Sequence, residues 1–139
     1  MSDSRSGMNY APQGKPNPVV APGEFVIAAT ALEHGHIYGM CNGLTEAGAT
    51  LKWVYDPDEE KVARFLKAFP QAKAASSEQQ ILQDPEVRLV AGAAVPSERC
   101  ALGLKVMDHG KDYFTDKAPF TTLEQLEAAR AKVKETGRK

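Results

Sequence analysis

FVIAATALEHGHIYGMCNGLTEAGATLKWVYD, residues 25–56, is the stretch of sequence that decides the fold. It opens on an uninterrupted apolar run, residues 25–31, which is typical of a strand buried on both faces of a parallel sheet. Apolar residues then recur at helical spacing over 37–47, and a second strand follows at 50–55. A parallel neighbour can be reached only through a long connection, so this order predicts a right-handed βαβ unit.

The same alternation of strands and helices continues to the end of the chain. Further strands are expected over 72–75, 87–94 and 112–115, and further helices over 57–69, 76–83, 97–109 and 122–137. Capping residues mark three of these helix starts: Ser76 with Gln79, Ser97, and Thr122 with Gln125. The pattern predicts an α/β fold with a doubly wound parallel sheet of the Rossmann type. Five strands are present, and we expect the sixth strand and a second domain to be missing.

Composition limits the chain to one globular domain. It has 139 residues, of which 42% are apolar and 25% charged. Residues 1–23 are polar and rich in proline, and they are expected to form a flexible N-terminal arm before a domain over 24–139. The net charge of −1 argues against nucleic acid and anionic membranes as partners. Two cysteines far apart, without a CxxC pair, favour a reducing compartment, the cytoplasm.

Chemistry is expected at the carboxyl ends of the strands, where ligands bind in doubly wound sheets. Four segments lie there: LEHGH at 32–36, Asp56, AAVPS at 93–97 and DKAPF at 116–120. The loop after the first strand should bind a dinucleotide pyrophosphate through backbone N–H groups that glycines leave accessible. Here Ala31 to His36 stand where Gly-x-Gly-x-x-Gly is expected, and Glu33 brings a carboxylate toward that anion.

Polar residues of these segments have more than one interpretation. Asp56 could accept hydrogen bonds from an adenosine ribose, which favours NAD over NADP, or it could simply begin a turn and cap a helix. His34 and His36 suggest a metal by their spacing, but no Cys, Asp or Glu cluster supports them in the sequence, so no metal is expected. They could contact a nucleotide or substrate, or be plain loop residues. Lys117 could reach the cleft and orient a hydroxyl or polarise a carbonyl, or it could be solvated.

The segments IAATALEHGHIYGM, WVYDPDEEKVARF, ILQDPEVRLVAGAAVPSERC and YFTDKAPFTTLEQLEAA together resemble the N-terminal domain of the Gfo/Idh/MocA oxidoreductases. This family is named for glucose–fructose oxidoreductase and inositol dehydrogenase. The resemblance implies a Rossmann domain for NAD or NADP, followed in intact members by an α/β domain that contacts a sugar or polyol. The family's Glu-Lys-Pro motif would map onto Asp116, Lys117 and, across an inserted Ala118, Pro119.

From the resemblance we expect a catalytic role for Lys117. The expected cofactor-binding residues are Leu32, Glu33, His34, Gly35, His36, Ile37, Asp56, Ala94, Pro96, Asp116 and Lys117. The chain would be the nucleotide-binding part of an NAD(P)-dependent oxidoreductase, inactive alone. It could form a homo-oligomer or use a partner chain that supplies the missing domain. The alternative is a non-catalytic Rossmann-type binding or interaction module, which Glu33 favours.

Overall fold

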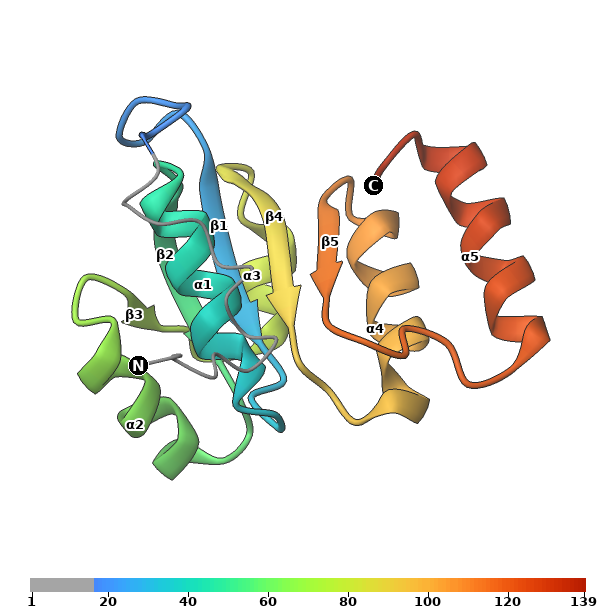
Figure 1. Cartoon of the computed structure of the whole chain (residues 1–139), viewed down its shortest axis with the longest axis horizontal. Coiled ribbons are helices and arrows are strands. Elements are labelled where there is room, and N and C mark those ends of the chain that lie inside the picture. The colour runs from blue at the N-terminus through green and yellow to red at the C-terminus, as the bar shows by residue number, and fades with distance from the viewer. Residues whose placement is uncertain (1–16) are drawn as a thin grey trace, which may run out of the picture.

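The computed structural model describes residues 17–139, and in this range a sheet of five strands organises the chain (Figure 1). The strands are β1 (Val26–Thr30), β2 (Thr50–Tyr55), β3 (Lys73–Ala74), β4 (Val87–Gly92) and β5 (Asp112–Thr115). The helices are α1 (His36–Glu46), α2 (Glu59–Ala68), α3 (Glu78–Gln83), α4 (Pro96–Asp108) and α5 (Leu123–Thr136). None of the helices in the described range is both long and apolar enough to cross a membrane.

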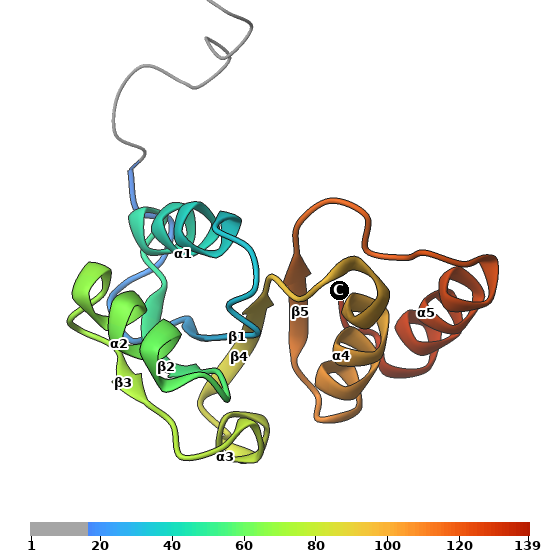
Figure 2. The ribbon, with the colours of Figure 1, turned by 90° about the horizontal axis from the view of Figure 1, so that it is seen from below.

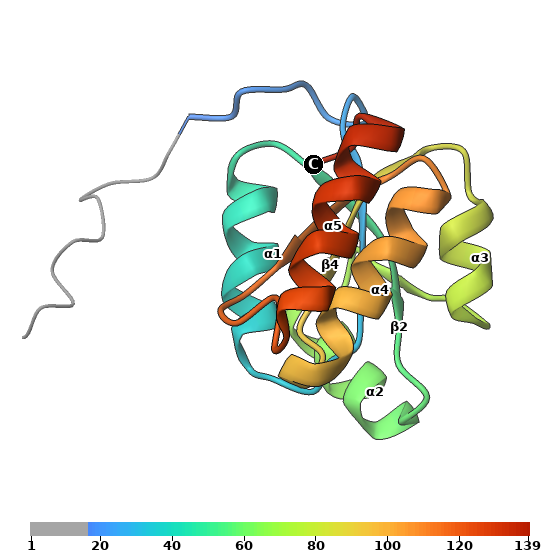
Figure 3. The same ribbon diagram turned by 90° about the vertical axis from the view of Figure 1, so that its right-hand side faces the viewer.

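The sheet is parallel throughout, with the strand order β3-β2-β1-β4-β5. The order reverses at β1, which pairs with β2 on one side and with β4 on the other. Helix α1 lies on one face of the sheet and helices α3 and α4 lie on the other (Figure 3), while α5 packs outside α4 (Figure 2). The predicted doubly wound α/β fold is therefore confirmed.

Burial on both faces explains the continuous apolar run in β1. Ile27 and Ala29 point into the core cluster beneath α1 and α2, which also contains Phe65. Ala28 points the other way, into the cluster beneath α3 and α4, where it joins Val106. Because successive side chains of a strand alternate between faces, a strand with a core on each side is apolar along most of its length, and in β1 only Thr30 at its end is polar.

Hydrogen bonds to side chains fix the starts of three helices, and the first is α2, where Asp58 accepts from the N–H groups of Glu60 and Lys61. Ser77 caps α3, because its Oγ accepts from the N–H of Gln80 at 3.1 Å, so the expected cap at Ser76 is one residue too early. Ser76 still takes part, since its N–H donates to the Gln80 side chain. The cap at Thr122 is confirmed by its bond from the N–H of Gln125, also 3.1 Å long.

Helix α4 begins without a side-chain cap, so the cap expected at Ser97 is wrong. Its N-cap is Val95, and Pro96 occupies the first helical position. Proline suits this position because its fixed φ fits the helix, and its missing N–H is one that a helix leaves unpaired. Ser97 then lies one residue inside the helix, beyond the place where its hydroxyl could cap.

The described end of the predicted N-terminal arm is bound to the domain. Val19 donates its N–H to the carbonyl of Ala47 at 2.8 Å, and Gly23 donates to Thr50 Oγ1 at 2.8 Å. These two bonds attach Val19 and Gly23 to the end of α1 and the start of β2. The flexibility expected for residues 1–23 stays a prediction, and residues 1–16 of that arm lie outside the described range.

A polar cluster around Asp84 joins β2 to the turn before β4. The Asp84 carboxylate, 11% exposed, accepts from Trp53 Nε1 at 2.7 Å and pairs with Lys52 Nζ at 2.7 Å. It also accepts from the N–H of Glu86 at 2.9 Å. Burial raises the pKa of Asp84, but the hydrogen bonds from these partners outweigh burial and lower its pKa from 3.8 to about 2.

We expect this cluster to make the fold sensitive to acid. A carboxylate whose pKa is lowered by folding stabilises above its unfolded pKa, and this contribution is lost as the pH falls through the folded value. Asp84 should therefore contribute about 2 kcal/mol that disappears between about pH 4 and pH 2. Urea unfolding at about pH 5 and pH 2 should show a larger loss in the wild type than in Asp84→Asn. An equal loss in both chains would contradict the assignment.

Candidate functional site

The loops that follow β1 and β4 are joined at the carboxyl edge of the sheet. Ala93 donates its N–H to the carbonyl of Ala31 at 3.0 Å, and His34 donates to the carbonyl of Ala93 at 3.1 Å. These bonds extend the β1–β4 pairing beyond the strands and hold the loop before α1 over the end of β4. The site is therefore built at the point where the strand order reverses, as the sequence predicts.

Two N–H groups of the loop before α1 remain open to a ligand. The N–H groups of Leu32, His34 and His36 are used within the protein. Those of Glu33 and Gly35 bond to no atom of the described residues. Gly35 is the N-cap of α1, and a Cβ placed on it would meet nothing within 4 Å. Unpaired N–H groups at the start of a helix attract anions, so this loop can bind one despite its missing glycines.

Asp56 connects the first two loops of the site. Its side chain is buried, with the residue 4% exposed, at the end of β2. Oδ2 accepts from the N–H of Leu32 at 2.7 Å, and Oδ1 accepts from the N–H of Asp58 at 2.9 Å. The bond to Asp58 is the turn-forming role weighed from the sequence. The bond to Leu32 was not expected, and it shows that Asp56 also fixes the loop before α1.

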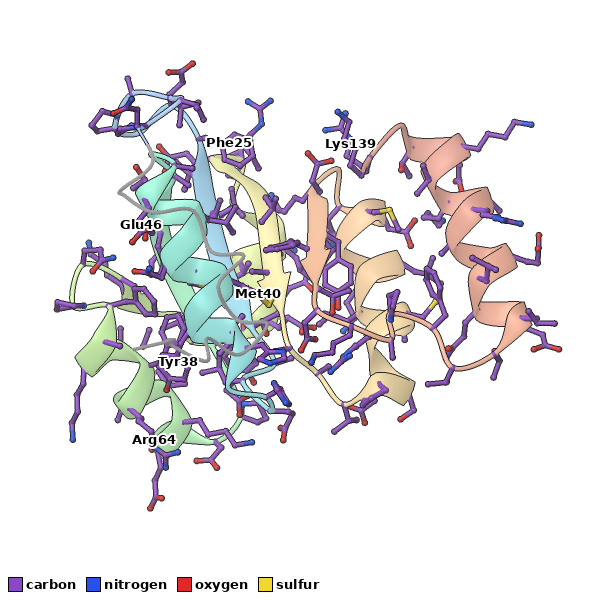
Figure 4. The ribbon with its side chains drawn as sticks, in the orientation of Figure 1. Phe25, Tyr38, Met40, Glu46, Arg64 and Lys139 are labelled. Atoms are coloured by element: carbon purple, nitrogen blue, oxygen red, sulfur yellow. The ribbon has the colours of Figure 1, made fainter. Side chains whose placement is uncertain are left out.

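A basic cavity of about 580 Å³ opens beside this loop. The residues lining it are Leu32, Glu33, Gly35, Tyr38, Lys61, Arg64, Lys67 and Ala68. Three of them are cations spaced three residues apart on α2, a pattern that sequence reasoning missed although it places them on one helix face. Figure 4 shows Tyr38 and Arg64 at the carboxyl edge of the sheet.

Glu33 does not leave a free negative charge at the loop. Its carboxylate lies 2.9 Å from Lys61 Nζ, and this hydrogen bond raises the pKa of Lys61. The pair therefore carries no net charge, and Arg64 and Lys67 leave the cavity positive overall. This pairing removes the objection that Glu33 would repel an anion. Lys61 lies on α2, and the sequence pattern did not connect that helix with the loop before α1.

Asp116, directly after β5, is the centre of a second polar group. Its side chain is 8% exposed, and its Oδ2 lies 2.9 Å from His36 Nδ1 and 3.7 Å from His34 Nδ1. Arg99 of α4 lies on the other side, with Nη2 3.1 Å from Oδ1, and its Nε donates to the carbonyl of Ala94 at 2.7 Å. Arg99 is a site residue that sequence reasoning missed, since nothing in its local pattern separates it from a solvated arginine.

The remaining residues predicted to bind the cofactor differ in their exposure to solvent. Lys117 is exposed and makes no ion pair or hydrogen bond within the described residues, next to Ala118, whose φ of 54° turns the chain. Ala94 is buried under α4, and Pro96 is exposed at its start. Ile37 is fully buried in the core, so its side chain supports the loop and cannot contact a ligand.

Two solved oxidoreductase structures share this fold. The one from Erwinia carotovora atroseptica SCRI1043 is 44% identical and gives a TM-score of 0.79. The match covers 83% of this chain and 34% of that protein's chain. The myo-inositol dehydrogenase from Lactobacillus casei, solved with NAD(H) and myo-inositol, is 25% identical and gives a TM-score of 0.72. The match covers 83% of this chain and 34% of the chain of that dehydrogenase.

Curated relatives are inositol dehydrogenases. The scyllo-inositol 2-dehydrogenase (NAD(+)) of Bacillus subtilis (strain 168) is 30% identical over 65% of this chain and 26% of its own length. The inositol 2-dehydrogenase/D-chiro-inositol 3-dehydrogenase of Lacticaseibacillus casei is 34% identical over 71% of this chain and 28% of its own length. Thus the matched part spans little more than a quarter of these relatives.

The family model described as "Oxidoreductase family, NAD-binding Rossmann fold" matches residues 29–139. This range begins inside β1 and includes the loop before α1, the end of β2 and the Asp116 segment, which are the parts that form the site. The chain therefore belongs to the Gfo/Idh/MocA family of oxidoreductases.

Proposed function

We propose that this chain is the nucleotide-binding part of an NAD(P)-dependent oxidoreductase that acts on a sugar, polyol or related compound by hydride transfer. The observation that carries the proposal is the pair of N–H groups at Glu33 and Gly35 that bond to nothing within residues 17–139, beside a basic cavity at the switch point of the sheet. A dinucleotide pyrophosphate is an anion of the kind such a helix start binds. The inositol dehydrogenases among its relatives support the substrate class.

The cofactor would lie along the carboxyl edge of the sheet. We assign the pyrophosphate to the loop at 32–37 and the adenosine ribose to the neighbourhood of Asp56. Both oxygens of Asp56 accept one N–H each, and a carboxylate offers about four lone-pair sites, so it can still accept from a ribose hydroxyl. The nicotinamide end would lie toward 94–96 and Asp116, where the bound cofactor supplies or accepts the hydride.

Lys117 would be the residue of this chain that contacts the substrate. It directly follows Asp116, which the Arg99 ion pair holds in place, and its own ammonium is exposed. An ammonium can donate to a substrate hydroxyl and stabilise the negative charge that develops on that oxygen. The relatives are about two and a half times as long as this chain, so we propose that further substrate contacts come from a domain outside residues 24–139, on the same or a partner chain.

The two cysteines bear on where the protein is found in the cell. Cys41 and Cys100 are both buried and unpaired, and we assign the protein to the cytoplasm, where thiols stay reduced.

The alternative of a non-catalytic module depended on Glu33, whose charge is compensated by Lys61. The ion pair thus removes the observation that favoured this alternative.

Calorimetric titration of the chain with NAD, NADH, NADP and NADPH tests the proposal. Saturable binding is expected, and Asp56→Ala should weaken it about ten- to a hundredfold, because the loop before α1 loses the charged acceptor of the Leu32 N–H. Arg64→Ala, which removes a cation from the cavity wall, should weaken it about tenfold.

Arg88→Ala is the matched control, since Arg88 is an exposed arginine on β4 outside the cavity. Circular dichroism of each variant shows whether it is folded. A folded wild-type chain that binds none of the four nucleotides would refute the proposal, as would equal weakening by Arg64→Ala and Arg88→Ala.

A further inference from the structure

The fold brings a third potential metal ligand to the two histidines of the loop before α1. The sequence offers only His34 and His36 in this region, on either side of Gly35. Asp116 lies 80 residues beyond His36 in the chain, yet the two side chains are in hydrogen-bond contact. One ligand atom from each of the three residues lies within 4.8 Å of the other two. The sequence-based reason for expecting no metal, the lack of a supporting acidic residue, therefore does not hold in the folded chain.

We propose that His34, His36 and Asp116 form a binding site for a divalent transition-metal ion of the zinc class. Two imidazole nitrogens and one carboxylate oxygen are a ligand set that zinc and its neighbours in the first row accept. Ligands of a tetrahedral ion with bonds of about 2.1 Å lie about 3.4 Å apart. The distances from Asp116 Oδ2 to the two Nδ1 atoms, 2.9 Å and 3.7 Å, bracket that value.

Hydrogen bonds occupy both histidine nitrogens that would bind the ion. His34 Nδ1 accepts from the N–H of His36 at 3.1 Å, so it carries no proton, and an ion would displace this N–H from its lone pair. His36 Nδ1 shares a proton with Asp116 Oδ2, and a cation would take the place of that proton. The two side chains are 52% and 44% exposed, so an ion reaches the nitrogens from solvent.

The environment of Asp116 provides the second argument for a ligand. The side chain is more than nine-tenths buried, and Arg99 Nη2 lies near Oδ1 without forming a hydrogen bond to it. Arg99 itself is fixed by its bond to the carbonyl of Ala94. The carboxylate is thus oriented from behind by a buried cation, while Oδ2 faces the histidines. Groups that hold a ligand in this way commonly tune metal sites.

The two cysteines and the third histidine of the chain lie outside the proposed site. The two cysteines are buried, and burial raises the pKa of Cys41 to about 12 and also raises that of Cys100, so both remain thiols. The remaining histidine, His109, caps the end of α4 and its Nδ1 is bonded to the carbonyl of Lys105. His109 is therefore a matched control that lies outside the proposed site.

Cobalt titration of the chain tests the site directly. The protein is used without a histidine tag, stripped with chelator, and titrated with Co²⁺ in the absence of nucleotide, with visible absorption as the readout. One ion per chain is expected, with the absorption of a four- or five-coordinate ion, and Zn²⁺ should displace it. Because no nucleotide is present, this outcome is independent of whether the chain binds NAD or NADP.

Variants then locate the ion. His36→Ala and Asp116→Asn should each weaken Co²⁺ binding about a hundredfold, since removing even the partner of a ligand costs about ten- to a hundredfold. His109→Ala should bind as tightly as the wild type. If Asp116→Asn does not fold, His34→Gln and His36→Gln, both at exposed positions, carry the comparison. Absence of saturable binding to the wild type, or equal affinity of His36→Ala and His109→Ala, would overturn the proposal.

Discussion

Phe65→Ala is expected to lower the free energy of unfolding by about 3–5 kcal/mol. Phe65 is fully buried on the inner face of α2. Its ring lies 4.7 Å from that of Phe69 and 5.5 Å from that of Tyr38, measured between centroids. Alanine would leave a cavity between α1, α2 and the sheet. The rings of Tyr38 and Phe69 would each lose their contact with the Phe65 ring.

Chemical denaturation followed by circular dichroism measures this loss. Phe114→Ala is the matched control, because Phe114 is 40% exposed on β5 and should lose about 1 kcal/mol or less. A Phe65→Ala chain as stable as the Phe114→Ala chain would show that the core beneath α1 and α2 is not packed as described.

Arg99→Met should destabilise the chain by a similar amount, about 3–5 kcal/mol, for an electrostatic reason. Methionine preserves much of the apolar stem of this buried residue but removes the guanidinium. The Asp116 charge, in a side chain that is 8% exposed, then loses its cation, and the carbonyl of Ala94 loses its donor. Breaking a buried pair by removing one partner costs more than removing both.

A double-mutant cycle with Asp116→Asn distinguishes this explanation from a loss of packing. Adding Asp116→Asn to Arg99→Met should recover part of the lost stability, because the unpaired charge is gone. The free energies of unfolding of both single variants and the double variant, from urea denaturation at neutral pH, give the coupling. Strictly additive losses would mean that the two side chains do not interact.

The fold was predictable because its signals are local. The run at 25–31 is apolar at every position except Thr30, since β1 has a core on each face, and Thr122 caps its helix through a bond to Gln125, three residues away. The cap at Ser97 could not be judged from the same local rule, because Pro96 satisfies the helix start in another way.

The candidate site was only partly predictable, because its contacts depend on strand order. Asp116 contacts His36 since the loops after β1 and β5 meet at one edge of the sheet. Similarly, Lys61 neutralises Glu33 only because α2 lies beside the loop before α1. Position in a loop after a strand identified Asp116, whereas Arg99 inside α4 carried no such signal.

A ribosome releases β1 long before both of its neighbours in the sheet exist. Ile27 pairs with Leu51 of β2, which is synthesised soon afterwards. Its other partner, Leu89 of β4, lies about 60 residues beyond Ile27 in the chain and is synthesised much later. In the interval β1 is the open edge of a half-built sheet, and unpaired apolar edges promote association between chains. We therefore expect a chain that ends before β4 to associate more readily than one that includes it.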